Sequence, residues 1–382
     1  MLLSIVVYTT LALSLFALGW HAHRREQRLM ATKGKHLAFF SWEIVLSILL
    51  FACVAGARYH TGYDHAMYLH QYQFFQKYCF FTRDFEPLFM WVTQLMSSAH
   101  LHYFFYFALW AALQIGLIYY ACRYSKFLLP WLGLYLMLGP FFLDWMNTMR
   151  QGVCECAFVF AVEFIQKRKF WPYLLVIATA ALIHKSAILM LPLYLINKQP
   201  TINIKWAFVL MAVAVALGFV TSWLKLFDGI SSLLSNFGSV RYADALQRLS
   251  DNGGRMVHWG PVRIMNLIIP CLIVAFYPKV KEHFAKEKLF PYYVLMVIIW
   301  FCVNNILVNT TVFMTRPFEY FKIFTLVANA YLLAYFFKTK RWAWLVVLCL
   351  LSFSNAYIDV TKAVAVPTEV NATFLYHFCF LR

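Results

Sequence analysis

Long apolar runs follow one another along almost the whole chain, separated by short polar segments. The runs are about 15 to 22 residues long, the length that an α-helix needs to cross roughly 30 Å of hydrocarbon. No linker rich in Pro, Ser or Gly divides the chain, so we expect one all-α transmembrane domain over residues 1–382. The pattern predicts about twelve spans, at about residues 1–20, 37–57, 101–122, 127–143, 152–166, 171–184, 186–197, 206–224, 263–278, 289–308, 316–337 and 343–359.

Two regions depart from this regular pattern. The runs within residues 152–197 are short for full spans, which predicts broken or re-entrant helices there. Residues 86–98 are apolar but too short to cross, so they should form a helix lying on or dipping into the outer face. Four prolines interrupt the short runs or their neighbours: Pro130, Pro140, Pro172 and Pro192.

Positive charge is concentrated in alternate loops between the predicted spans. These loops hold 19 of the 33 lysines and arginines, and the positive-inside rule places them in the cytoplasm. The same rule places both termini outside, together with two longer segments at about 58–85 and 225–262. The basic loops are 21–36, 123–126, 166–170, 198–205, 279–288 and 338–341.

The composition is that of a membrane protein. Only 13% of the residues are charged and 63% are hydrophobic, whereas soluble proteins have about 25% charged residues. A net charge of +17 would suggest nucleic acid in a soluble protein, but much of it lies in the short loops, so no nucleic-acid partner is expected. Residues 1–20 lack a basic leader and a cleavage site, which favours a retained span over a signal peptide.

Metal and nucleotide chemistry find little support in the sequence. Seven of the nine cysteines lie inside apolar runs, where a thiol packs as a small apolar group. His60, His65 and His70 are five positions apart, a spacing that scatters their rings around a helix. No Gly-rich phosphate loop is present in a suitable context. We therefore expect neither a metal nor a cofactor.

Several arginines lie at the predicted exterior boundary, where topology alone disfavours positive charge. A guanidinium binds phosphate oxygens through two parallel hydrogen bonds and stays charged at any working pH. We therefore predict one exterior cavity that binds pyrophosphate; the alternative is that each arginine only reaches out to lipid headgroups. The five arginines are Arg58, Arg150, Arg255, Arg263 and Arg316.

Other polar residues near the exterior face suggest the remaining chemistry. His184 lies where two short apolar segments meet, and its neighbour Lys185 should keep the ring neutral, as a general base requires. Asp64 is the alternative base. Glu86 lies in the same exterior region among aromatic residues that can stack on sugar rings. Arg150 belongs to a polar patch over residues 144–151 and could instead pair with Glu155.

Four motifs occur in order: R-Y-x-x-G-x-D-x-x-x-Y, then E-P-x-F, then N-x-x-R-Q, then H-K-S-A-x-x-x-x-P-L-Y. Together they cover about residues 1–200 and resemble the EpsG-like, Wzy-type polysaccharide polymerases. The second half has no motif that can be aligned, so Arg255, Arg263 and Arg316 rest on physical arguments alone. The resemblance adds to the candidate site Arg58, Tyr59, Asp64, Glu86, Asn147, Arg150, Gln151, His184 and Lys185.

The resemblance implies a GT-C-like helical membrane fold and a glycosyltransferase in the bacterial inner membrane. Such an enzyme would polymerise oligosaccharide repeat units carried on undecaprenyl pyrophosphate, on the exterior face and without a metal. Membrane lipids and a chain-length regulator protein are the further partners expected. A polysaccharide transporter or flippase, and a related ligase of lipid-linked sugars, are the alternatives; a transporter predicts inverted repeats, and none is visible.

Overall fold

The computed structural model describes residues 2–62, 64–82, 84–219, 261–308, 315–365 and 376–380. Within these ranges the chain is helical, and its only β pairing is an isolated bridge between Arg58 and Phe378. The predicted all-α class is confirmed. The predicted exterior segment 225–262 lies almost entirely outside the described residues, and so does Arg255.

The first half of the chain contains several short helical elements. Two of them, α6 and α7, are inclined by 65° at Gly139–Pro140, where a proline cannot continue the helix. This break and the short elements after α8 agree with the broken helices expected there. The elements are α1 (Leu2–Lys33), α2 (Trp42–Gly56), α3 (His65–Tyr78), α4 (Pro87–Ser98), α5 (Tyr103–Ala121), η1 (Lys126–Leu128), α6 (Leu129–Leu138), α7 (Phe141–Asn147), α8 (Met149–Gln166), α9 (Phe170–Ala181) and η2 (Lys185–Leu195).

The second half packs around one central helix. Every residue of α16 from Ile323 to Phe336 is buried, and α16 contacts α6, α13, α14 and α17. Such a helix is apolar all round because other helices cover every face. The described elements of this half are α10 (Ile204–Gly218), α13 (Pro261–His283), α14 (Phe290–Ile306), η3 (Arg316–Phe321), α16 (Ile323–Lys338) and α17 (Trp342–Ala365).

Helices occupy each of the twelve ranges predicted to span the membrane. Among the described residues, four helices are long and apolar enough to cross a membrane, or five if the bent pair α6–α7 counts as one span. The chain is thus a membrane protein, while the count of twelve and the GT-C-like arrangement stay predictions. Large exposed apolar side chains on the outer helices, such as Leu13, Trp171 and Leu195, are those that lipid would cover.

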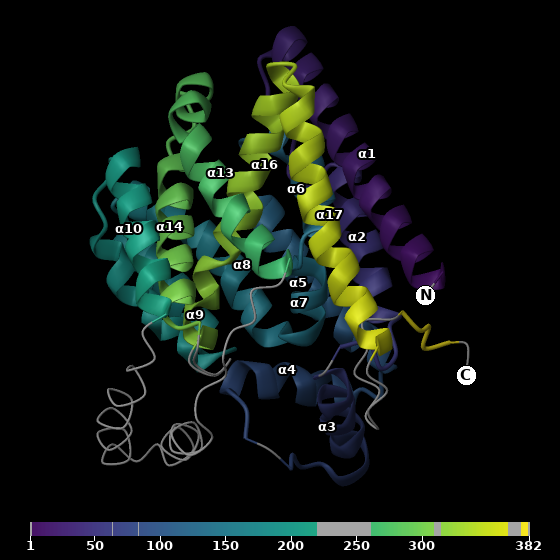
Figure 1. The fold of residues 1–382 in the computed structure, drawn as a ribbon. Helices are drawn as coiled ribbons and strands as arrows, with labels where there is room; N and C mark the ends of the chain where they lie inside the picture. The colour runs from purple at the N-terminus through teal and green to yellow at the C-terminus, as the bar shows by residue number, and fades with distance from the viewer. Residues whose placement is uncertain are drawn as a thin grey trace.

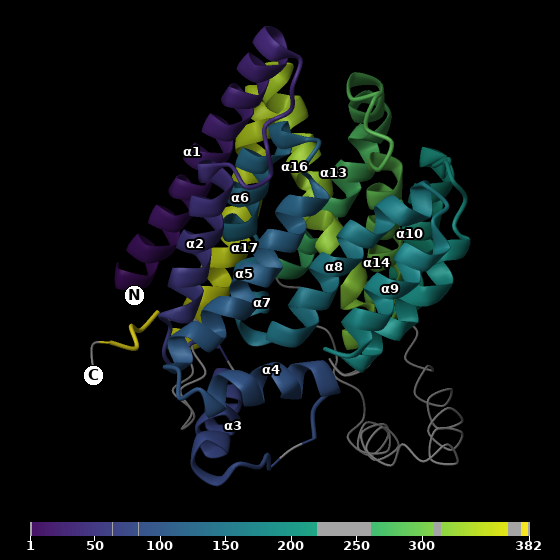
Figure 2. The same cartoon turned by 180° about the vertical axis from the view of Figure 1, so that it is seen from behind.

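The two ends of the helical bundle differ. The carboxyl ends of α1, α13 and α16, each followed by a basic loop, lie at one end in Figure 1, whereas α3 and α4 lie at the other. Figure 2 shows α4 lying across the ends of the upright helices. A backbone hydrogen bond of 2.9 Å from Leu88 to Leu182 ties α4 to the segment after α9.

Candidate functional site

Glu86 is the centre of a polar cluster at the α4 end of the bundle. It immediately precedes α4, and Pro87 fixes the first turn of that helix. One carboxylate oxygen, Oε1, contacts His184 Nδ1 at 3.1 Å and accepts from the Lys185 backbone amide at 3.0 Å. The other, Oε2, forms an ion pair with Arg150. Three motifs far apart in the sequence thus meet on one carboxylate.

Arg150 is held on all sides. Its guanidinium pairs with Glu86 and donates from Nε to the Tyr68 hydroxyl at 3.3 Å. It also lies over the rings of Phe85 and Phe89, at 4.7 and 5.2 Å from their centroids. The alternative pairing of Arg150 with Glu155 does not occur, since Glu86 is its partner. Arg150 therefore anchors the Glu86 carboxylate in place.

The Glu86 carboxylate selects the tautomer of the His184 ring. Burial alone would raise the pKa of the Glu86 carboxyl, but the hydrogen bond from His184 and the charge of Arg150 outweigh it and lower the pKa to about 2. An ionised carboxylate can only accept, so the Nδ1 of His184 carries the proton. In a neutral ring the other nitrogen, Nε2, then offers its lone pair, which is the arrangement of an oriented general base. The sequence had predicted that the neighbouring Lys185 sets the state of the His184 ring. In the structure the side chain that contacts the ring is Glu86.

A cavity of about 130 Å³ lies beside this cluster. Both His184 and Arg150 line it, and their side chains are 24% and 17% exposed. The positive charges of Lys185 and Arg316 also face it, and both residues are exposed. Within the described part of the chain, neither of these two side chains has a carboxylate within salt-bridge distance. The cavity thus combines a basic nitrogen with cations that are available to an anion.

Asp64 reaches the same cavity through a turn. The preceding Gly62 has a φ of +93°, a conformation that favours glycine, and this accounts for the glycine of the first motif. The Asp64 backbone amide donates to Asn147 Oδ1 at 2.9 Å, which joins the first and third motifs. Asp64 therefore lines the cavity with His184, and both candidate bases border one space.

The short helix η3 forms one wall of the cavity through Arg316 and Pro317. Gln151 holds this wall: its Nε2 donates to the Arg316 carbonyl at 3.0 Å and to Glu319 Oε2 at 3.4 Å. On the same wall, the Ser186 and Tyr320 hydroxyls are 3.0 Å apart. These contacts attach η3 to α8 and η2, so that Arg316 from the second half of the chain faces His184 from the first.

Arg58 and Tyr59 lie apart from this cavity. The Arg58 side chain is buried, donates to the carbonyls of Ala55 and Met146, and lies 4.6 Å from the Phe107 ring centroid. The Tyr59 backbone amide donates at 2.8 Å to the carbonyl of His377, so these residues hold the C-terminal segment against the end of α2. Neither residue lines the cavity that contains His184.

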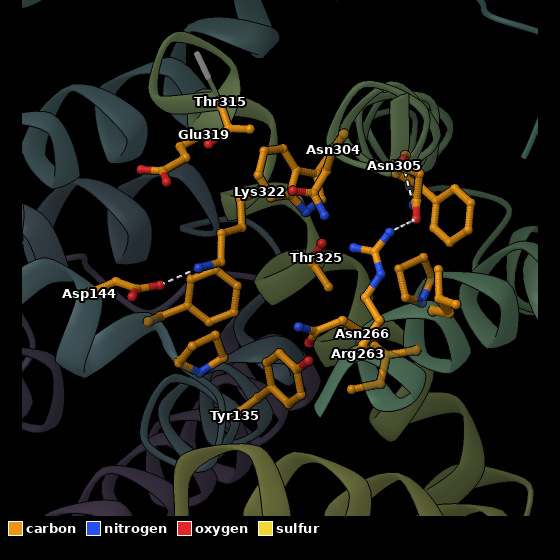
Figure 3. A pocket seen from close by; sticks show the side chains of 17 residues that line it. Tyr135, Asp144, Arg263, Asn266, Asn304, Asn305, Thr315, Glu319, Lys322 and Thr325 are labelled. Atoms are coloured by element: carbon orange, nitrogen blue, oxygen red, sulfur yellow. Dashed lines mark hydrogen bonds and ion pairs between the residues drawn. The ribbon is translucent and has the colours of Figure 1, made fainter. Parts of the chain in front are cut away.

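A second cavity, of about 290 Å³, is bordered by Thr315, just before η3, and by Glu319 within it (Figure 3). Arg263 lines it and donates to Asn305 Oδ1 on one side, while Lys322 pairs with Asp144 on the other (Figure 3). The four described arginines thus do not line one cavity: Arg150 and Arg316 share the first, Arg263 borders the second, and Arg58 is buried elsewhere.

The family of the chain follows from comparison with models of known protein families. A model of the EpsG family matches residues 41–377. The chain belongs to the EpsG family. The match extends through the second half of the chain, including η3 and most of the lining of the second cavity, where the sequence has no motif that can be aligned. No curated protein and no solved structure matches this EpsG-family chain.

Three site residues of this EpsG-family protein escaped the sequence reading: Glu319, Lys322 and Asn305. Each lines the second cavity. Glu319 and Lys322 fall within an apolar run predicted to span the membrane, and ionisable groups at that depth are costly and usually functional. That signal was available in the sequence. Asn305 had no comparable signal, because an amide within an apolar helix is uncharged and its role depends on the Arg263 side chain from another helix.

Proposed function

We propose that this EpsG-family protein polymerises lipid-linked oligosaccharide repeat units by glycosyl transfer. The carrier proposed is undecaprenyl pyrophosphate, and the reaction takes place on the exterior face of the bacterial inner membrane. Membership of the EpsG family supports a membrane-bound polysaccharide polymerase. The observation that carries the chemistry is the Glu86–His184 pair at the edge of a cavity lined by cations.

In the proposed reaction, a hydroxyl of the acceptor sugar attacks the anomeric carbon of the donor. A bond forms between that oxygen and the anomeric carbon, and the bond from the anomeric carbon to the pyrophosphate oxygen breaks. His184 Nε2 takes the hydroxyl proton, and Glu86 stabilises the imidazolium that results. A neutral alcohol is a weak nucleophile. Removing its proton while the new bond forms therefore lowers the activation barrier of the transfer.

The leaving pyrophosphate is stabilised by positive charge, and the cations that line the cavity differ in how available they are to it. The Arg150 charge is already matched by Glu86, so its main contribution is to hold that carboxylate. Arg316 and Lys185 are exposed and line the cavity, which makes them the better ligands for departing phosphate oxygens. The proposal therefore assigns base chemistry to His184, positioning to Glu86 and Arg150, and anion binding to Arg316 and Lys185.

The exterior location of the reaction is a proposal based on charge. The cavity lies toward the α4 end of the bundle, and the basic loops after α1, α13 and α16 lie at the opposite end (Figure 1). Basic loops favour the cytoplasmic side, so the site would face outward. There it would meet repeat units that have already crossed the membrane, with membrane lipids and a chain-length regulator protein as further proposed partners.

The experiment is an analysis of surface polysaccharide chain length in a strain lacking this gene. A polymerase predicts that single repeat units are still made and exported, while the ladder of longer chains disappears and returns with the wild-type gene. A flippase predicts that no repeat unit reaches the outer face. A ligase predicts full-length polymer that is not attached to its acceptor. Either of these last two patterns would refute the proposal.

A further inference from the structure

The second cavity is the larger of the two and has a different chemical character. It lies among α6, α7, α13, α14 and the start of α16, and η3 separates it from the His184 cavity. A volume of about 290 Å³ is near the lower end of the range for small-molecule sites, roughly 300 to 1,000 Å³. The reaction proposed above uses none of the side chains that line it.

Its charges balance, unlike those of the first cavity. Asp144 and Glu319 offset Lys322 and Arg263. Lys322 is already paired with Asp144, and Arg263 with the amide oxygen of Asn305. In the first cavity Arg150 is paired with Glu86, and the remaining charges are two cations, Lys185 and Arg316, against the carboxylate of Asp64. An anion such as pyrophosphate would therefore prefer the first cavity, because its charges leave a positive excess, whereas those of the second cancel.

The uncharged lining of the second cavity suits a ligand with many hydroxyl groups. Side-chain amides and hydroxyls come from Asn266, Asn304, Thr315 and Thr325, and each of these groups can donate and accept hydrogen bonds, as a sugar hydroxyl does. Among the described residues, Thr325 Oγ1 has no hydrogen-bond partner although it is buried at this wall. The aromatic rings of the lining offer flat faces for the C–H surface of a pyranose: Tyr135, Phe141, Trp300 and Phe301.

The two cavities share η3 as a wall. Arg316 and Pro317 face the first cavity, whereas Thr315 and Glu319 face the second. Gln151 binds both sides at once, through the carbonyl of Arg316 and the carboxylate of Glu319. A molecule that carries a pyrophosphate at one end and several sugars beyond it could therefore occupy both spaces, one on each side of η3.

We infer that the second cavity binds sugar residues of the repeat unit, while the first holds the pyrophosphate and the reacting centre. The inference rests on the proposed function, because it names how that same substrate is divided between two sites. Asn304 and Thr325 would bind sugar hydroxyls, and Trp300 would contact a ring face. The occupant is recognised as a neutral saccharide and not as a second anion.

The test measures binding of two separate probes by the purified protein in detergent. The first probe is an oligosaccharide released from the host strain's surface polysaccharide, without lipid or phosphate; the second is inorganic pyrophosphate. Asn304→Leu and Thr325→Val should each weaken binding of the oligosaccharide about tenfold, as expected for a lost hydrogen bond. Neither change should alter pyrophosphate binding. Arg316→Ala should do the opposite, and Asn197→Leu, at an exposed position outside both cavities, is the matched control.

Two results would overturn the inference. One is oligosaccharide binding by the wild-type protein that Asn304→Leu and Thr325→Val both leave intact, and the other is no oligosaccharide binding at all. The deletion strain separates this inference from the proposed function. If that strain keeps its full polysaccharide ladder while oligosaccharide binding still depends on Asn304, then the polymerase proposal fails and the saccharide site stands.

Discussion

The Glu86 carboxylate contacts the Nδ1 of His184 at 3.1 Å, across 98 positions of the sequence. Because Arg150 and the Lys185 amide bind the same carboxylate, its position is fixed from three directions. A carboxylate held in this way selects one tautomer of the imidazole and stabilises its protonated form. The pair links α4 to the start of η2, so the geometry of the proposed base depends on how α4 packs across the bundle.

Replacing Glu86 by glutamine tests that relationship. The change Glu86→Gln keeps the size of the side chain but removes its charge, so it should lower the rate of polymerisation about 10²- to 10⁴-fold. The rate would be measured with purified protein and lipid-linked repeat units, at matched protein amounts. Glu282→Gln is the control, because Glu282 is exposed at the end of α13, far from α4. A wild-type rate in Glu86→Gln would show that the carboxylate does not support the base.

The low pKa of Glu86 predicts a specific pH dependence of stability. With a pKa of about 2 in the folded protein against an ordinary value of 4.5, the carboxylate stabilises the folded state fully above about pH 4.5. This contribution is lost as the pH falls from there toward 2. The difference in melting temperature between wild type and Glu86→Gln should therefore shrink as the pH falls below about 4.5. A difference that stays unchanged from pH 4.5 down to pH 3 would contradict the assignment.

Arg58 and Arg150 should respond differently to the same substitution. Arg58→Lys loses donors to two backbone carbonyls in a buried site and should destabilise the protein by about 1 to 3 kcal/mol. Arg150→Lys should leave protein abundance near normal but lose most activity, since lysine cannot reproduce the contacts to Glu86 and Tyr68. Thermal unfolding and polymer yield distinguish the two. Loss of activity in Arg58→Lys without loss of stability would instead favour a substrate-binding role for Arg58.

Sidedness can be tested with a native thiol. Cys79 is exposed at the end of α3, at the α4 end of the bundle, so a membrane-impermeant maleimide should label it in intact spheroplasts. Cys79→Ser should remove that signal. Thr32 lies at the carboxyl end of α1, at the end of the bundle opposite α4. A cysteine introduced there by Thr32→Cys should react only after the membrane is permeabilised. The reverse pattern would place the cavity with His184 on the cytoplasmic side and exclude an exterior reaction.

The sequence predicted the helical class, the positions of the apolar runs and most residues around the first cavity. Periodicity and length suffice for the runs, because hydrocarbon thickness fixes helix length. His184, Asp64 and Arg150 were singled out by their polar character near the predicted exterior face, and they also belong to short motifs that keep their order along the chain. Their meeting point on Glu86 could not be deduced, since it depends on contacts among three segments separated by 64 to 99 positions.

The arginines show where sequence reasoning fails. Arg58 and Arg316 each lie at the end of an apolar run, yet one is buried against carbonyls and the other is exposed at a cavity. A boundary position gives the depth of a residue but not the direction of its side chain. Arg263 likewise faces a different cavity because η3 intervenes. The different surroundings of these three arginines follow from tertiary packing, which the sequence pattern does not give.

The most direct test of the central claim compares two variants in the deletion strain. His184→Ala removes the proposed base, and Asp64→Asn removes the only other candidate base, which borders the same cavity. With both proteins present at normal membrane abundance, polymer ladders on a gel should show single repeat units for His184→Ala and longer chains for Asp64→Asn. A full ladder from His184→Ala together with single units from Asp64→Asn would contradict the account and make Asp64 the base.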